Sequence, residues 1–442
     1  MTADLDALAT QARLYGFPLV FDLEQVVRYT TTGVGANPQA SFNTFSHARA
    51  LASAADTFVS INNDTVYSMA SLDLGVGPVR LSVPASDRYY VLQFVDAWTD
   101  NFAYVGTRGT GNGAGEFLIV PPGWEGDAGG LTVVHAPTRV VSIVGRWSCA
   151  GIDDLPAVHA LQDATTLTPS DPDAVAGGIP TTAPQGDDVL DFWEKYRVWS
   201  QAFPPAPRDE ALQASFAALG LTGSTPVNEL TGEQQAALRA GAQAGDGVIA
   251  QAMAGSAVDA APGTWSQTLH VFDYNLDFFE VGAKGDDEWK IADPRLRIGG
   301  RAVAAKAGLW GNHGYEAAYV MTFLDDDGQA LTGEHEYELR LTPPPPVGAF
   351  WSVTMYSLPE FYLVDNEIDR YSVGDRTPGI VTDAAGGLTI RISRTRPSDA
   401  EAAANWLPAP EGAFRPILRM YMPGDAVLDG SYAPPPITRL NG

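Results

Sequence analysis

Residues 58–69 read Phe58-Val-Ser-Ile-Asn-Asn-Asp-Thr-Val-Tyr-Ser-Met69, and residues 88–100 read Arg88-Tyr-Tyr-Val-Leu-Gln-Phe-Val-Asp-Ala-Trp-Thr-Asp100. Between them lies a further strand pattern that ends at Pro84. Apolar and polar residues alternate through these segments and on to about residue 148, and this period of two is typical of β-strands. Because glycine and proline separate the short strands, the pattern predicts an antiparallel β-sandwich.

The composition indicates an acidic protein with a large core. The chain has 442 residues, 45% of them hydrophobic, and a formal net charge of −26, so we expect two or three domains. An acidic surface repels nucleic acid and anionic lipid. We see no secretion signal and no apolar run of the ~20 residues that span a bilayer, and the single cysteine, Cys149, excludes an intramolecular disulfide. We therefore expect a cytoplasmic protein with a small-molecule substrate, without nucleic acid or membrane as partners, and we leave a homo-oligomer open.

The predicted fold class is mainly β with a helical insert (α+β), built on two antiparallel jelly-roll-like β-sandwiches. An N-terminal helical segment is expected to break at Gly16-Phe-Pro18. Apolar residues at helical spacing predict one of the helices of the insert over residues 264–284. The predicted parts are the N-terminal helical segment (1–57), the first sandwich (58–150), the helical insert (151–314) and the second sandwich (315–442).

The two β regions match each other in order and in spacing. Tyr67–Asp73 aligns with Tyr319–Asp325, and Tyr89–Phe94 aligns with Phe350–Met355. Two explanations stay open: an internal duplication, or a pattern that any two antiparallel sandwiches share. A duplication requires the same strand order in both regions.

The motifs resemble two bacterial families. We find the resemblance to the domain of unknown function 1254 in Ile61-Asn-Asn-Asp-Thr-Val-Tyr-Ser68, Arg88-Tyr-Tyr90, Asp96-Ala-Trp-Thr99 and Gly113-Ala-Gly-Glu-Phe-Leu118. We find the resemblance to its usual companion, the domain of unknown function 1214, in Ala349-Phe-Trp-Ser-Val-Thr-Met-Tyr356, Asn405-Trp-Leu-Pro-Ala-Pro410 and Leu428-Asp-Gly430. The resemblance implies paired jelly-roll sandwiches, distantly similar in architecture to peptide:N-glycosidase F, and no particular reaction.

Asp96 is the first candidate for a catalytic residue. The period of two places it on the strand face that carries Tyr90, Phe94 and Trp98. Burial beside these rings would raise the pKa of the carboxyl and suit it to general acid or base chemistry. The alternative is an Asp that accepts backbone N–H groups in the turn before Asp100. The aligned position of the second β region is Ser357, so the shared fold does not require a carboxylate there.

A second group of candidates precedes the first strand. Asn62, Asn63 and Asp64 are typical of Asx turns, which is one interpretation. The other is that Asp64 is an acid or base and Tyr67 a hydrogen-bond donor in the same cleft as Asp96, with the two asparagines contacting the substrate.

Three further residues are candidates for substrate binding. Arg146 could bind an anion, or form an ion pair with Asp96 or Asp100. Trp98 could stack on a ring of the substrate, and His313, flanked by glycines, could lie on an exposed loop. No pair of histidines has metal-ligand spacing, so we predict no metal site, and the sequence assigns no cofactor.

Three functions are consistent with these residues. The first is a hydrolase- or lyase-like enzyme that acts on a small polar or aromatic molecule in a cleft by the first sandwich. The second is a non-catalytic module that binds carbohydrate or a partner chain through Trp98, Trp351 and Trp406. The third is an assembly scaffold. An enclosed pocket with a shielded carboxylate favours the enzyme, whereas an open aromatic face favours binding.

Overall fold

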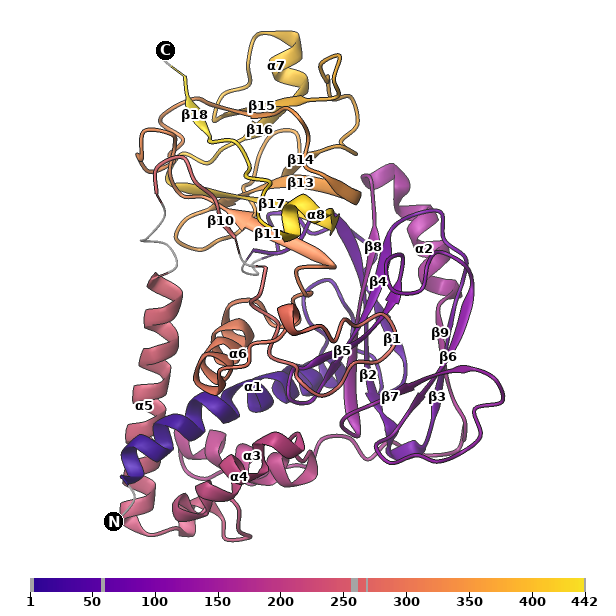
Figure 1. Ribbon diagram of the computed structural model, residues 1–442, viewed down its shortest axis with the longest axis vertical. Coiled ribbons are helices and arrows are strands. Elements are labelled where there is room, and N and C mark those ends of the chain that lie inside the picture. The colour runs from indigo at the N-terminus through magenta and orange to yellow at the C-terminus, as the bar shows by residue number, and fades with distance from the viewer. Residues whose placement is uncertain (1–3, 57–59, 256–260, 268, 441–442) are drawn as a thin grey trace.

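The structure, a computed structural model, describes residues 4–56, 60–255, 261–267 and 269–440. It is a mixed α+β fold, largely β, with two sandwiches and a group of helices packed beside the first of them (Figure 1). The predicted start of the first sandwich, residue 58, lies outside the described residues. The helices are α1 (Leu5–Thr31), α2 (Leu155–Ala164), α3 (Asp188–Ala202), α4 (Glu210–Ser215), α5 (Gly232–Gly255), α6 (Pro294–Gly308), α7 (Ala400–Ala404) and α8 (Asp425–Leu428).

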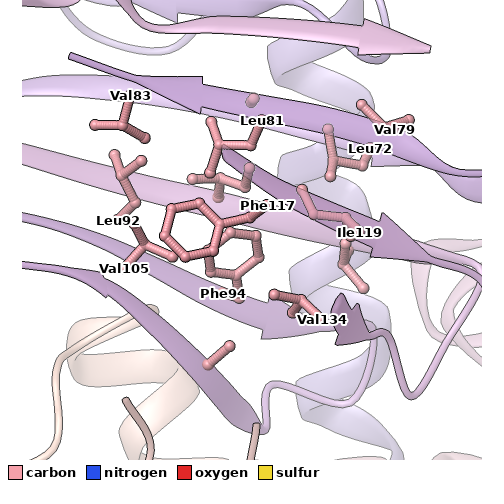
Figure 2. Close-up of a cluster of buried hydrophobic side chains, with 14 of the residues drawn as sticks. Leu72, Val79, Leu81, Val83, Leu92, Phe94, Val105, Phe117, Ile119 and Val134 are labelled. Carbon is pink, nitrogen blue, oxygen red and sulfur yellow. The ribbon is translucent and has the colours of Figure 1, made fainter. Parts of the chain in front are cut away.

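The first sandwich consists of a large sheet in the order β1-β2-β8-β4-β5 and a small sheet in the order β7-β6-β3-β9. Alternate residues such as Leu72, Leu92 and Phe117 point between the sheets and form its core (Figure 2). Two of its strands, β1 and β9, lie outside residues 58–150. The strands are β1 (Phe45–His47), β2 (Thr65–Asp73), β3 (Val79–Val83), β4 (Tyr90–Asp96), β5 (Asn101–Gly106), β6 (Gly115–Val120), β7 (Thr132–His135), β8 (Val140–Ser148) and β9 (Thr166–Pro169).

The second sandwich repeats this arrangement. Its sheets run β10-β11-β17-β13-β14 and β16-β15-β12-β18, the same order with each strand nine places later in the chain. Both small sheets contain one parallel pair, β6 with β7 and β15 with β16, where we predicted only antiparallel strands. The strands are β10 (Ser266–Gln267), β11 (Ala317–Met321), β12 (Tyr337–Leu341), β13 (Val347–Ser357), β14 (Ser372–Gly374), β15 (Leu388–Ser393), β16 (Trp406–Pro408), β17 (Phe414–Pro423) and β18 (Thr438–Arg439).

The register of the strands is also the same in the two large sheets. Tyr67 lies opposite Arg146 in the first, and Tyr319 lies opposite Arg419 in the second. The outer face of each large sheet therefore carries an arginine beside a tyrosine at corresponding positions.

Helix α1 is continuous, although we predicted a break at Gly16–Pro18. An interior proline costs about 3 kcal/mol of helix stability. Here apolar residues before and after Pro18, such as Ala12 and Leu23, are buried in the same helical core, which holds both halves in line. Gly16 itself lies against the ring of Tyr196, where a larger side chain would overlap.

The predicted helix over 264–284 was also wrong, because its described residues form β10 and turns. Trp265 and Leu269 pack into the core of the second sandwich, whereas Phe272 and Tyr274 pack near α6. Their helical spacing thus arises from two separate contacts. Within the described ranges, no helix is long and apolar enough to cross a membrane.

Candidate functional site

The outer faces of the two large sheets contribute to the junction between the sandwiches. The ring of Tyr89, which directly precedes β4, lies 5.7 Å from that of Phe350 and 5.5 Å from that of Tyr421, both in the second sandwich. The Tyr89 hydroxyl donates to the Glu316 carboxylate at 2.8 Å. The junction is therefore aromatic and contains buried polar groups.

In each sandwich, one buried carboxylate is hydrogen-bonded to side chains of the other sandwich. Asp64 accepts hydrogen bonds from Ser352 at 2.7 Å and from Tyr421 at 3.3 Å. Glu316, at the corresponding place before β11, accepts from Tyr89 and pairs with Arg108 at 2.5 Å. Asp64 thus contacts the second sandwich, a role that the sequence did not reveal because its partners are 288 and 357 residues away.

The two predicted asparagines lie at the same junction and also form the Asx turn. The side-chain oxygen of Asn62 accepts from the backbone N–H of Asp64 at 2.6 Å, and its amide donates to Tyr421 at 2.9 Å. Asn63 donates to the carbonyl of Ala52 at 2.5 Å. Both amides are therefore hydrogen-bonded within the protein.

Tyr67 and Arg146 lie side by side on adjacent strands. The guanidinium of Arg146 lies 5.4 Å from the centre of the Tyr67 ring. It donates to the side chain of Gln93 and to the backbone carbonyl of Trp310, both at 2.8 Å. Tyr67 is half-buried, whereas Arg146 is buried. The geometry makes Arg146 a residue that positions Tyr67 and the loop at Trp310.

Asp96 lies at the other end of β4, where it both forms the predicted turn and is fully buried. One carboxylate oxygen accepts the backbone N–H groups of Trp98 at 2.9 Å and Asp100 at 2.8 Å. Burial, and then the nearby Asp100, raise the pKa of Asp96 to about 8. The predicted ion pair of Arg146 with Asp96 or Asp100 does not form, because Arg301 of α6 pairs with Asp100.

A second buried carboxyl, Asp22 of α1, lies close to Asp96. Burial raises its pKa well above the ordinary value, and Asp96 raises it further. The indole N–H of Trp310 donates to it at 2.6 Å, which partly opposes the shift. Sequence reasoning missed Asp22, although an acidic residue between Leu19 and Val26, on the apolar stripe of a helix, was a usable signal.

A small hollow lies on the other side of Trp310. Its volume is about 10 Å³, room for about one water molecule. The rings of Trp310 and Tyr29, which both line it, lie 5.7 Å apart and are tilted by 44° to each other. Its lining comes from α1, the loop before β1, strands β1, β2 and β8, and the insert, through Tyr29, Ala40, Thr44, Ser46, Met69, Ala70, Ser71, Ser142 and Trp310.

Trp98 and His313 are both buried away from this hollow. The indole N–H of Trp98 donates to the carbonyl of Phe203 at 2.9 Å, in the helical core. His313 is 1% exposed, so the exposed loop that we predicted is wrong. Its ring nitrogen lies 2.8 Å from the hydroxyl of Tyr104 and 3.1 Å from that of Tyr315. Burial lowers the pKa of His313 to about 3, and the imidazole is neutral.

The predicted residues therefore separate into two groups. Asn62, Asn63, Asp64, Tyr67 and Arg146 lie at or beside the junction, and Asp96 lies with Asp22 beside the helices. Trp310 connects the groups, because its carbonyl accepts from Arg146 and its indole donates to Asp22. Across the part of the chain that the structure describes, no group of three or more His, Cys, Asp or Glu side chains is placed to hold a metal ion.

Comparison with solved structures places the fold among known ones. The VPA0106 protein from Vibrio parahaemolyticus superposes with a TM-score of 0.71 at 23% sequence identity, over 99% of this chain and 100% of that chain. An uncharacterised protein from Burkholderia cenocepacia has a TM-score of 0.45 at 14% identity, over 99% of this chain and 96% of that chain. The first likeness supports the fold alone. Among proteins with curated descriptions, none matches the sequence.

Two family models match the two β regions. Residues 42–169 match the protein of unknown function DUF1254, and residues 316–425 match the protein of unknown function DUF1214. The first match begins before β1 and ends with β9, so it spans the strands of the first sandwich. The resemblance found in the sequence motifs is thereby confirmed: this chain combines the domains of unknown function 1254 and 1214.

Proposed function

We propose that this protein is a hydrolase- or lyase-like enzyme that acts on a small polar or aromatic molecule beside the first sandwich. The observation that carries the proposal is the pair of buried carboxyls, Asp22 and Asp96, of which Asp22 accepts a hydrogen bond from Trp310 in the wall of the hollow. Buried carboxyls with raised pKa values are typical of general acids.

In this mechanism Asp96 is the general acid. With a pKa of about 8, its carboxyl holds a proton at neutral pH and could transfer it to a leaving group. Because the hollow has room for only about one water molecule, Trp310 would have to move for a substrate to enter and to reach the carboxyls. Trp310 and Tyr29 would then contact the substrate. Trp310 has a positive φ of 65°, an uncommon conformation for a bulky residue that is found at functional sites.

The alternative, a non-catalytic binding face, has less support. Its expected aromatic residues, Trp98, Trp351 and Trp406, are 3%, 3% and 2% exposed. None of them offers an open ring to a carbohydrate. The buried tryptophans count against the binding face, and the shielded carboxyls support the enzyme, although neither carboxyl lines the hollow itself.

The test is turnover of a panel of chromogenic esters, amides and glycosides. We expect Asp96→Asn to lower turnover by about 100-fold or more, and wild-type activity to fall as the pH rises through about 8. The matched control is Asp87→Asn, because the side chain of Asp87 is 83% exposed. Full turnover by Asp96→Asn, or no turnover of any member of the panel by the wild type, would contradict the proposal.

We also infer that the two sandwiches are duplicated jelly-roll-like units. The shared strand order and the corresponding Tyr–Arg pairs support this inference. A small-molecule substrate, a cytoplasmic location and a homo-oligomer remain predictions from the sequence.

A further inference from the structure

The region of the second sandwich that corresponds to the hollow carries a buried cation. Ser142, which lines the hollow, lies four residues before Arg146 on β8. Four residues before Arg419 on β17 lies Arg415. The matching strand order and register place Arg415 where the first sandwich has Ser142.

Arg415 is 8% exposed, and its hydrogen bonding is incomplete. One terminal nitrogen, Nη2, donates to the hydroxyl of Ser60 at 2.5 Å, and Nη1 lies 3.5 Å from the sulfur of Met321. Its Nε–H has no hydrogen-bond partner within the described part of the chain. The guanidinium lies 4.3 Å from the centre of the Phe361 ring and 5.6 Å from that of Phe323. Met321, Phe323 and Phe361 are half-buried, so the group lies close below the surface.

No carboxylate of the described residues forms an ion pair with Arg415 or with its neighbour Arg419 within 4.0 Å. The Arg419 guanidinium donates instead to Thr354, to the hydroxyl of Tyr356 and to the carbonyl of Ser60, at 2.9, 2.7 and 2.9 Å. Burial and the neighbouring Arg419 together lower the pKa of Arg415 to about 10, although Tyr356 opposes this shift. In a chain of net charge −26, buried guanidinium groups without a paired carboxylate are unexpected.

Two other arginines show what the Nε–Nη2 edge of Arg415, whose Nε lacks a partner, is suited to bind. Arg13 holds Asp246 through Nε and Nη2, at 2.9 and 3.1 Å. Arg197 holds Glu194 through the same two nitrogens, at 2.9 and 2.6 Å. In Arg415 this edge has only the neutral hydroxyl of Ser60 on Nη2. A carboxylate would fill both positions, in the paired geometry that a guanidinium prefers.

The backbone beside this edge is strained. Ser60 has a φ of 54° and Phe361 a φ of 61°, both uncommon for residues other than glycine. The N–H of Ser60 donates to the carbonyl of Phe361 at 2.8 Å, so the two strained residues hold each other in place. Strained backbone of this kind is found at ligand-binding sites. It lowers the stability of the fold, and packing alone does not require it.

We propose that Arg415 forms the recognition site for the carboxylate of a small organic acid, with Met321, Phe323 and Phe361 contacting the apolar body of that acid. The carboxylate takes the Nε and Nη2 positions and displaces the Ser60 hydroxyl. The site is separate from the Asp22–Asp96 pair, so each proposal can fail without the other.

The experiment is calorimetric titration of the full chain with benzoate, hexanoate and inorganic phosphate at constant ionic strength. We expect benzoate or hexanoate to bind saturably, and Arg415→Gln to weaken this binding by about tenfold or more. Arg415→Lys keeps the charge but lacks the paired donors, and it should weaken binding as well. The matched control is Arg340→Gln, because the side chain of Arg340 is 73% exposed.

Ser60→Ala provides a test in the opposite direction. It removes the hydroxyl that the carboxylate displaces, so we expect binding to become tighter. The proposal is overturned if neither organic acid binds the wild type, if phosphate binds as tightly as they do, if Arg415→Gln or Arg415→Lys binds like the wild type, or if Ser60→Ala weakens binding. Where Arg415→Gln fails to fold, Arg415→Lys and Ser60→Ala still decide the outcome.

Discussion

The outer faces of the two large sheets share one framework and differ in their ionisable groups. Both carry a tyrosine opposite an arginine, Tyr67 with Arg146 and Tyr319 with Arg419. At the end of β4 the first sandwich has the buried carboxyl of Asp96, and the aligned position of the second sandwich is Ser357. On the outer face, the second sandwich has Arg415 where the first has Ser142. Positions that agree between the sandwiches serve the fold, and positions that differ are the better candidates for function.

The largest effect is expected from the shared arginines. Arg146→Met and Arg419→Met each leave buried acceptors without a donor, so both should lower the free energy of unfolding by about 3 kcal/mol or more. Urea denaturation measures this, with Arg340→Met as the exposed control. Losses below about 1 kcal/mol at either position would show that the arginines are not part of the common framework.

The pH dependence of stability should differ between variants at the aligned positions Asp96 and Ser357 of the two large sheets. A raised pKa in the folded state means that the unfolded chain binds fewer protons between about pH 4 and pH 8, so stability falls as the pH rises through this window. Asp96→Asn removes this penalty. Relative to wild type, the variant should gain about 2 kcal/mol or more between about pH 5 and pH 8. Ser357→Ala should show no such gain in stability. If the two variants show the same pH dependence, the first sandwich does not differ from the second by a buried acid at this position.

The tight strand contacts should be sensitive in both sandwiches, and more so at Gly106, whose φ of 150° disfavours a larger residue. A Cβ at Gly106 or at Gly374 would overlap the backbone carbonyl of the neighbouring strand, at Tyr90 or Trp351. We expect Gly106→Ala and Gly374→Ala each to cost about 1–3 kcal/mol in thermal unfolding. Gly113→Ala, with open space around it, is the control. A loss of stability at only one of the two glycines would contradict the correspondence between the two sandwiches.

The smallest effect concerns the carboxylates exchanged across the junction. Tyr89→Phe removes a donor from Glu316, and Ser352→Ala removes one from Asp64. Each should cost about 1 kcal/mol in denaturant unfolding. The double variant should show additive losses, since the two bonds involve separate partners. Strong coupling would mean that the junction acts as one network.

The sequence predicted the sandwiches well, because the burial pattern of each strand can be read from its own residues. Alternation in segments such as Val140–Arg146 marks the inner and outer faces directly. The tyrosines of the aligned segments, Tyr67 and Tyr319, lie opposite corresponding arginines in the two sheets.

The candidate site was only partly predictable, because its partners come from distant segments. Asp96 was visible at the end of its strand, but its neighbours Asp22 and Arg301 lie on helices that no local pattern connects to it. Arg146 was visible, yet its partner at Trp310 is a backbone carbonyl, which carries no sequence signal. Trp98 looked like a stacking ring because the sequence does not show that α1 and α3 cover it.

The most direct test of the account is an NMR titration of the aspartate carboxyl carbons in the wild type and in Asp96→Asn. We predict a carboxyl that titrates near pH 8 in the wild type, a signal that Asp96→Asn removes while shifting the titration of Asp22, its neighbour. If every aspartate of the wild type titrates below about pH 5, as ordinary carboxyls do, the buried acid pair does not exist and the proposed enzyme loses its general acid.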